Sequence, residues 1–115
     1  MFSTVILVLH DLGLLDDIIK AWREAGAPAI TILDSVGTRE IEDHGRLDDL
    51  PLMPSIKDLI QADDAPRKTM FAIIENDKVD PIIQATEATL GDLTEKDKGI
   101  LMVIELAKVV GYRGA

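Results

Sequence analysis

The sequence predicts an α+β fold with the ferredoxin-like βαββαβ order, in which two helices cover one face of a four-stranded antiparallel sheet. Two observations predict it. Aliphatic segments at residues 2–9 and 69–75 are each followed by an amphipathic helical pattern and then by another short aliphatic segment. A long polar stretch separates these two βαβ units, and right-handed crossovers in both units place the four strands in one sheet.

Residues 2–9 are the first expected strand. Their aliphatic side chains are nearly continuous rather than alternating, which is typical of a strand covered on both faces. The next apolar residues recur at helical spacing and predict a buried helix face, made of Leu15, Ile18, Ile19, Trp22 and Ala25. Gly26 lies just past the expected helix end, Pro28 prevents its continuation, and residues 30–33 begin the second strand.

Residues 34–68 differ from the rest of the chain in charge, with nine acids against five bases. We expect a long loop at about residues 37–68, because connections of this length are usually functional or disordered. Within it, Ser55 is a candidate N-cap for a short helix at residues 56–61.

The second unit begins with the expected third strand at residues 69–75, after which Asn76 or Asp77 is positioned to cap a helix. Gly91 stops this helix. Its predicted buried stripe consists of Val79, Ile82, Ile83, Thr86 and Leu90. Residues 100–106 are the fourth expected strand, and residues 107–112 are a candidate for a short fifth strand.

Composition limits the classes of function. The 115 residues, 47% of them hydrophobic, are expected to form a single domain over residues 1–115. A formal charge of −9 without a cluster of Lys and Arg argues against nucleic acid as a partner. The absence of cysteine excludes disulfides and thiolate chemistry. The amino terminus has no basic segment and only a short apolar run, which predicts a cytoplasmic protein.

Two helices cover only one face of the predicted sheet. The other face of nearly continuous apolar strands would expose a larger patch than soluble monomers usually tolerate. We therefore expect the chain to form an oligomer through this face, with cyclic symmetry as the usual way to close it.

Several short motifs resemble the P-II nitrogen-regulatory signalling superfamily, and more closely its P-II-like branch. They are Leu15-Asp16-Asp17, Thr31-Ile32 with Gly37, Lys98-Gly99-Ile100, residues 105–109 and Arg113-Gly114. This resemblance spans almost the whole chain outside the loop. It implies a homotrimer that binds an adenine nucleotide (AMP, ADP or ATP) in clefts between subunits. It also implies signalling through the long loop to a protein target, such as a membrane transporter or a metabolic enzyme.

The resemblance also implies a ligand site where the base of the loop meets the turn before the last strand. In the family pattern Thr31 matches a base-contacting threonine, Gly37 and Gly99 match glycines that the ligand approaches, and Arg113 matches a phosphate-binding arginine. The full expected set is Thr31, Val36, Gly37, Thr38, Arg39, Lys98, Gly99, Ile100 and Arg113. The chain has Arg39, Ile100 and Gly111 where the family has a glycine, a lysine and an arginine, and Lys98 is the candidate to supply the missing charge.

These observations predict a non-catalytic regulatory protein that senses a small molecule. The sequence contains no common nucleophile, P-loop or zinc-protease motif, and it assigns no cofactor. His10 and His44 have no third ligand at metal spacing, and the acids of the loop do not follow the EF-hand pattern. The alternatives are a divalent-metal-binding trimer of the cation-tolerance type and a purely structural interaction trimer.

Overall fold

The computed structural model describes residues 1–37, 66–95 and 98–113. The elements along the chain are β1 (Phe2–Leu9), α1 (Leu15–Glu24), β2 (Thr31–Val36), β3 (Pro66–Glu75), α4 (Val79–Leu90) and β4 (Gly99–Glu105). A 3-10 turn precedes each of these helices, at Leu12–Leu14 and at Asn76–Lys78. The elements therefore follow the predicted βαββαβ order.

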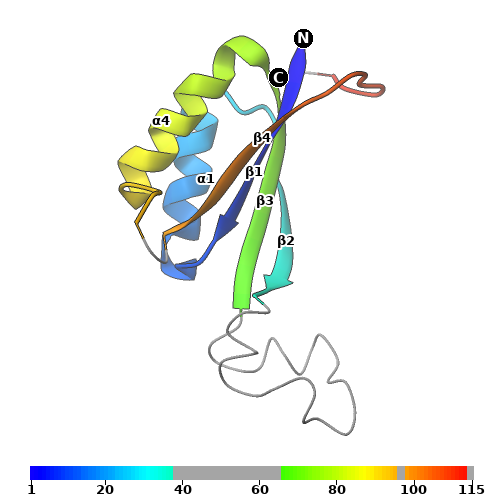
Figure 1. Ribbon diagram of the computed structural model, residues 1–115. Helices are drawn as coiled ribbons and strands as arrows, with labels where there is room; N and C mark the ends of the chain where they lie inside the picture. The colour runs from blue at the N-terminus through cyan, green and yellow to red at the C-terminus, as the bar shows by residue number, and fades with distance from the viewer. Residues whose placement is uncertain (38–65, 96–97, 114–115) are drawn as a thin grey trace, which may run out of the picture.

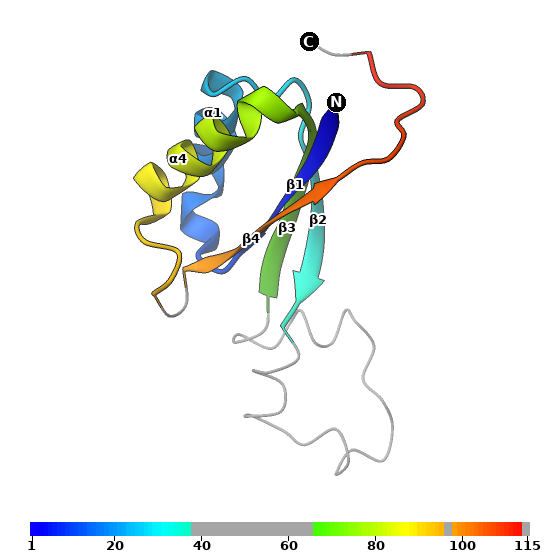
Figure 2. The same cartoon turned by 45° about the horizontal axis from the view of Figure 1, so that its top comes forward.

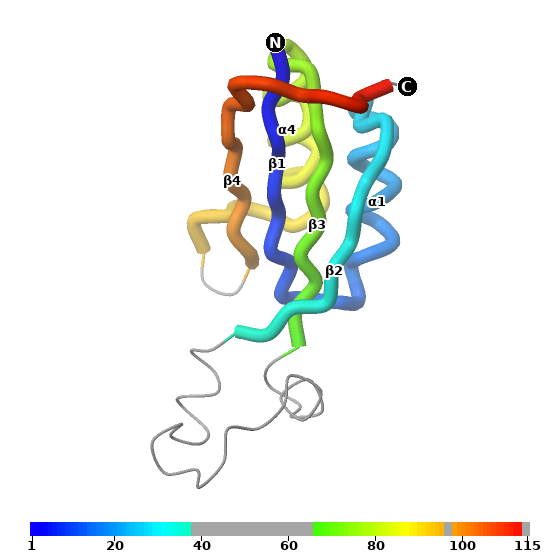
Figure 3. Tube along the Cα trace, turned by 90° about the vertical axis from the view of Figure 1, so that its right-hand side faces the viewer, coloured from blue at the N-terminus to red at the C-terminus, as the bar shows by residue number. Residues whose placement is uncertain are grey.

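The four strands form one antiparallel sheet in the order β2-β3-β1-β4. Helices α1 and α4 lie side by side on one face of this sheet, which confirms the predicted fold (Figures 1 and 2). Figure 3 looks onto the opposite face, over which none of the described helices lies. Neither α1 nor α4 is long and apolar enough to cross a membrane.

The core lies between the sheet and the two helices. Alternate residues of β1 face the helices and are buried, namely Ser3, Val5, Leu7 and Leu9. Met70 and Ala72 of β3 lie beside Leu7 and Val5 in register and are buried with them. The intervening residues of β1 are only partly buried, so the prediction of a strand covered on both faces is wrong for the single chain. The reason is that the helices cover one face only.

The predicted buried face of α1 is confirmed, with Trp22 fully buried beside Ile18. The Nε1–H of Trp22 donates a hydrogen bond to Oγ1 of Thr86 on α4 at 2.9 Å. The Thr86 hydroxyl in turn donates to the carbonyl oxygen of Ile82 at 2.8 Å. This chain of bonds satisfies polar groups inside the core and joins the two helices.

Helix α4 buries the predicted stripe through Ile82, Thr86 and Leu90, and it ends at Gly91 with φ of +91°. Its beginning differs from the prediction. Asn76 and Asp77 lie inside the 3-10 turn, and the N-cap of α4 is Lys78, which makes no capping bond through its side chain. Oδ1 of Asn76 instead accepts a hydrogen bond from Oγ of Ser3 at 2.7 Å, so this side chain joins the beginning of β1 to the end of β3.

Strand β3 begins at Pro66, earlier than the predicted residue 69, whereas β2 ends at Val36, next to the expected start of the loop at about residue 37. Asp34, Ser35 and Val36 belong to β2 and pair in antiparallel register with Lys68, Arg67 and Pro66 of β3. Residues 66–68 therefore belong to the sheet and not to the expected loop. The expected helix at residues 56–61 and its N-cap Ser55 lie outside the described residues.

The predicted fifth strand at residues 107–112 is wrong, since these residues form no strand. Gly111 has φ of +90°, a left-handed conformation that interrupts an extended strand. The segment instead crosses one end of the uncovered sheet face (Figure 3). There the ring of Tyr112 meets the ring of Phe2 edge to face, with their centroids 4.7 Å apart.

The uncovered side of the sheet is apolar, and we call it the open face. Its side chains alternate with the buried ones, so Ile6 of β1 shares this face with its register partners Phe71 of β3 and Met102 of β4. Ile100, Met102 and Ile104 of β4 are 55%, 42% and 50% exposed. A contiguous apolar surface on the single chain is thus left without a covering layer.

Candidate functional site

Seven of the nine predicted site residues lie in the described part of the chain, and Thr38 and Arg39 lie outside it. Val36 ends β2 and Gly37 follows it. Lys98 precedes β4, which begins with Gly99 and Ile100. Both groups lie at the end of the sheet where β2 and β3 run into the loop, and we call this the loop end (Figure 1).

Within one chain the two groups at the loop end lie on opposite edges of the sheet. The register places Asp34, Lys68, Leu9 and Gly99 in one row across β2, β3, β1 and β4. Three strand spacings of about 4.8 Å separate β2 from β4, so the two edges are roughly 14 Å apart. The structure therefore does not bring Gly37 and Gly99 of one chain around the same small group.

Thr31 and Arg113 form a second group, away from the loop end. Thr31 begins β2, and the five residues to Val36 span roughly 17 Å of strand. Arg113 directly follows Tyr112, whose ring lies against Phe2 at the far end of β1. A single chain thus divides the predicted site into three groups, which are Val36 and Gly37 at the β2 edge of the loop end, Lys98 to Ile100 at its β4 edge, and Thr31 with Arg113 beside Tyr112. We call the first and the last of these groups the two half-sites.

A cavity of about 110 Å³ lies at this second half-site. Its lining is mostly apolar and consists of Pro28, Ala29, Thr31, Phe71, Ala72, Ile73 and Tyr112. The chain has four aromatic residues, and three of them gather here, because Phe2 packs against Tyr112 and Phe71 lines the cavity. The sequence analysis did not include Tyr112 among the site residues. The signal that could have indicated it is its position as an aromatic residue directly after Gly111.

Two glycines have structural reasons of their own: Gly99, which matches the family pattern, and Gly111, which departs from it. Gly99 has φ of +130°, and a Cβ atom there would lie 2.7 Å from the carbonyl oxygen of Val8. The packing of β4 against β1 therefore requires glycine at this position, whether or not a ligand binds. Gly111 stands where the family pattern has an arginine. Its φ of +90° is unfavourable for any residue with a side chain, although the surrounding space is open.

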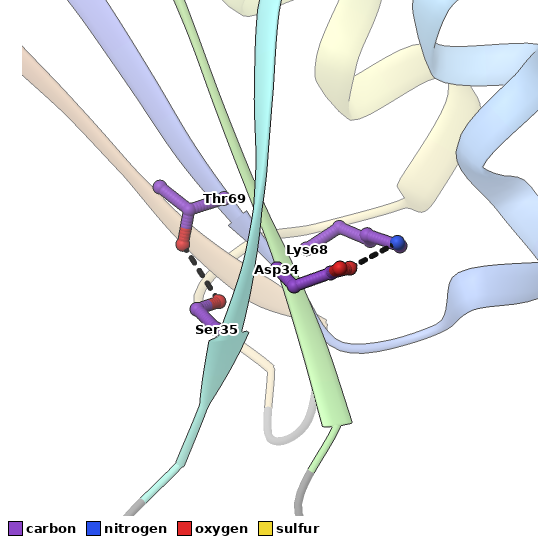
Figure 4. Close-up of polar contacts among 4 residues, drawn as sticks. All are labelled: Asp34, Ser35, Lys68 and Thr69. Atoms are coloured by element: carbon purple, nitrogen blue, oxygen red, sulfur yellow. Dashed lines mark hydrogen bonds and ion pairs between the residues drawn. The ribbon is translucent and has the colours of Figure 1, made fainter. Parts of the chain in front are cut away.

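Two cationic side chains of the loop end, Lys68 and Arg67, make contacts within the chain, and Figure 4 shows that of Lys68. The Lys68 ammonium and the Asp34 carboxylate form an ion pair on the side of the sheet that faces the helices. Nη1 of Arg67 donates to the carbonyl oxygen of Pro66 at 2.9 Å. On the open face, the Thr69 hydroxyl donates to Oγ of Ser35 at 2.8 Å.

The turn that leads from α4 towards Lys98 is organised by Asp92. Oδ1 of Asp92 accepts hydrogen bonds from the hydroxyl of Thr94 at 2.7 Å and from its backbone N–H at 2.9 Å. These bonds stabilise the ionised carboxylate, so they lower the pKa of Asp92, with the side-chain bond as the larger cause.

Metal ligands do not gather in the described ranges, where no group of three or more His, Asp or Glu side chains is placed to hold an ion. His10 follows the end of β1, and His44 lies outside the described residues together with the acids of the loop, Glu42, Asp43, Asp48 and Asp49. The chemistry that the described groups offer is apolar contact beside Tyr112 and cation or backbone contact at the two half-sites.

No family model matches the sequence, and no curated protein matches it significantly. Solved structures do match the fold. A structure of Arabidopsis thaliana PII bound to citrate superposes with a TM-score of 0.61 at 15% identity, covering 91% of this chain and 77% of that one. A structure of the B. subtilis GlnK-ATP complex gives a TM-score of 0.59 at 13% identity, covering 92% of this chain and 84% of that one. The chain therefore has the fold of PII proteins, and the resemblance noted in its sequence is confirmed at the level of the fold.

Proposed function

We propose that this chain is a non-catalytic regulatory protein that forms a homotrimer and binds an adenine nucleotide in clefts between subunits. It signals to a protein target through the loop at about residues 37–68. The observation that carries the proposal is the open face, which a single chain leaves uncovered in a fold shared with PII proteins. The two similar structures are described with a small molecule bound, ATP in one and citrate in the other, which supports a sensing function.

The open face supplies the driving force for assembly. Its exposed side chains on β4 are Ile100, Met102 and Ile104, and each is 42% exposed or more. Covering apolar surface gains roughly 25 cal/mol per Å². A cyclic trimer would bury this face of all three chains around one axis and would have a mass of about 38 kDa, three times the 12.6 kDa of the chain.

Assembly would also join the two half-sites that one chain keeps apart. Each interface of a cyclic oligomer brings two different surfaces of neighbouring chains together. In the proposed trimer, the loop end of one chain with Val36 and Gly37 faces Thr31 and Arg113 of the next. Backbone N–H groups at a glycine and an arginine side chain are the groups that recognise a phosphate.

Sedimentation equilibrium tests the assembly step. We expect a single species of about 38 kDa, three times the 12.6 kDa chain mass. A monodisperse monomer would contradict both the role of the open face and the shared cleft.

Titration calorimetry with AMP, ADP, ATP and divalent cations tests the ligand class. Arg113→Ala is expected to weaken nucleotide binding by about 1.5 to 3 kcal/mol, the range for a hydrogen bond to a charged group, and to leave the trimer intact. Arg23→Ala, on the exposed side of α1, is the matched control and should bind as the unmodified chain does. Equal binding by Arg113→Ala would show that this residue is assigned wrongly. Binding of cations alone favours the metal-binding alternative, and binding of nothing favours the structural trimer.

Mixing two variants with impaired ligand binding tests whether the cleft is shared between chains. Gly37→Val blocks the half-site at the loop end, and Arg113→Ala weakens the other half-site. In a shared cleft, every mixed trimer contains one interface with both half-sites intact. After the two variants are refolded together in equal amounts, about a quarter of the clefts should therefore bind the nucleotide with normal affinity. If both half-sites of one chain formed the cleft, no clefts of normal affinity would appear.

A further inference from the structure

The cavity at the second half-site opens on the open face of the sheet. Its lining includes Thr31 of the edge strand β2 with Phe71 and Ile73 of β3, whose register partners on β1 belong to the open face. Residues 106–113 run across this end of the sheet (Figure 3), and Tyr112 of this segment lines the same cavity. The cavity is therefore formed jointly by the sheet and by a segment near the carboxyl end of the chain, on the face that the proposed trimer covers.

The ring of Tyr112 has its own support within the chain. The ring of Phe2 meets it edge to face, with centroids 4.7 Å apart and 62° between the ring planes, an arrangement that aromatic pairs prefer. Gly111, with φ of +90°, turns the chain directly before Tyr112. Val110 before this turn is 87% exposed, whereas Tyr112 after it is partly buried. Phe2 and the turn at Gly111 therefore hold the ring of Tyr112 against the sheet.

The lining indicates which part of a ligand the cavity takes. None of the seven described residues that line it carries a charged side chain, and only Thr31 and Tyr112 carry a hydroxyl group. Apolar and aromatic walls with a few polar atoms are typical of pockets for a small organic group. A phosphate instead requires charged or backbone donors, and the exposed Arg113 is the next residue after Tyr112. The cavity thus suits the neutral base of a nucleotide, with the phosphates outside it.

We infer that Tyr112 is a ligand-contacting residue of the proposed cleft and that the base of the nucleotide stacks on its ring. This inference rests on the proposed nucleotide-binding function and adds a residue to the same cleft. The family pattern matches Thr31 and Arg113 but gives no role to Tyr112. Every base has a face that stacks on an aromatic ring, so Tyr112 supplies affinity for a base and not a choice between bases.

The test is a nuclear Overhauser measurement on the full chain, saturated in turn with AMP, ADP and ATP. Tyr112 is the only tyrosine, so selective labelling of tyrosine identifies its ring protons without ambiguity. We expect cross-peaks between these protons and the carbon-bound ring protons of adenine. Nucleotides that bind without such cross-peaks would overturn the inference and leave the proposed function intact. No binding of any of the three at millimolar concentration would refute the proposed function itself.

Two substitutions of Tyr112 test whether an aromatic ring is needed. Tyr112→Leu keeps an apolar side chain and removes the ring, so it should weaken nucleotide binding by at least about fivefold, the lower limit for loss of a base–aromatic contact. Tyr112→Phe keeps the ring and should bind within about twofold of the unmodified chain. Val110→Ala is the matched control, because Val110 lies in the same segment and is 87% exposed. It should bind as the unmodified chain does.

Calorimetry and sedimentation of these variants decide between binding and assembly. Equal affinities of Tyr112→Leu and Tyr112→Phe would overturn the inference, because the ring would then not contribute. The mass of Tyr112→Leu should remain about 38 kDa, three times the 12.6 kDa chain mass. Loss of the trimer in this variant, without the expected cross-peaks in the unmodified chain, would assign Tyr112 to the contact between subunits instead.

Discussion

The two faces of the sheet are built from alternate residues of the same strands, yet they differ in burial. On the central strand β1, Leu7 faces the helices and is 0% exposed, whereas its neighbour Ile6 on the open face is only partly buried. On the edge strand β4, Met102 and Ile104 of the open face are 42% and 50% exposed. Both faces are apolar in sequence. The sheet therefore has two apolar faces, and the helices of the same chain cover only one of them. The apolar side chains of the open face are the ones that we assign to the proposed assembly of subunits.

The largest expected effect comes from placing a charge on the open face. Met102 lies on the edge strand β4, in register with Ile6 of β1 on the open face. In Met102→Glu, burial of an unpaired carboxylate at the interface would cost several kcal/mol. We expect the sedimenting mass to fall from about 38 kDa to the 12.6 kDa of one chain. Gln84→Glu, on the exposed side of α4, adds the same charge and should leave the mass unchanged. A trimeric Met102→Glu variant would refute the difference between the faces.

The second prediction compares neighbouring residues of β1 in the monomeric Met102→Glu background. Leu7→Ala removes a fully buried side chain and should lower the free energy of unfolding by about 2 to 5 kcal/mol. Ile6→Ala removes a side chain that is only partly buried in one chain, so its cost should be less than half as large. Urea denaturation followed by circular dichroism measures both. Similar costs would mean that the open face is covered even in the monomer.

The third prediction concerns the helix layer alone. Thr86→Val removes the acceptor of the Trp22 indole N–H and leaves this buried donor unsatisfied, at a cost of about 1 to 3 kcal/mol in unfolding free energy. Thr89→Val is the matched control, because the Thr89 hydroxyl bonds only to the Ala85 carbonyl of its own helix among the described contacts. The same urea titration should show a smaller change for the control. Equal changes would indicate that the bond between the helices contributes nothing of its own.

The smallest effect is expected at Asp92, which belongs to neither face. Its pKa in the folded chain lies below the ordinary value of 3.8, chiefly because of the hydrogen bond from the Thr94 hydroxyl. The stability that this carboxylate contributes is therefore present above pH 3.8 and is lost as the pH falls through the lowered pKa. An NMR titration of the Asp92 carboxyl should give this low midpoint, and Thr94→Val should raise it. An unchanged midpoint in Thr94→Val would assign the shift to the backbone bond.

Most of the fold was predictable from local patterns. Helical spacing identified the buried face around Ile18 and Trp22, and aliphatic runs identified the four strands. The errors fall where tertiary contacts override local sequence. Pairing with Asp34 and Ser35 of β2 draws the polar residues Lys68 and Arg67 into β3. The left-handed Gly111 interrupts the expected fifth strand, so this segment crosses the sheet face instead (Figure 3).

The candidate site was less accessible to sequence reasoning than the fold. A motif gives the order of residues along one chain, whereas the proposed cleft also depends on which chain each residue belongs to. The separation of Gly37 from Gly99 follows from the strand order β2-β3-β1-β4, and the separation of Gly37 from Thr31 and Arg113 follows from the length of β2; no single motif contains either. The contact of Tyr112 with Phe2 joins the two ends of the chain, and neither local pattern signals it.

The position of Trp22 has a spectroscopic consequence. It is the only tryptophan, it is fully buried in the helix layer, and the only tyrosine, Tyr112, lies on the other side of the sheet. Dissociation of subunits should therefore leave the wavelength of tryptophan emission unchanged, while unfolding should shift it to the red. Ultraviolet absorption of the tyrosine should respond when subunits separate. One denaturant titration read at both chromophores would then resolve the loss of assembly from the loss of the fold.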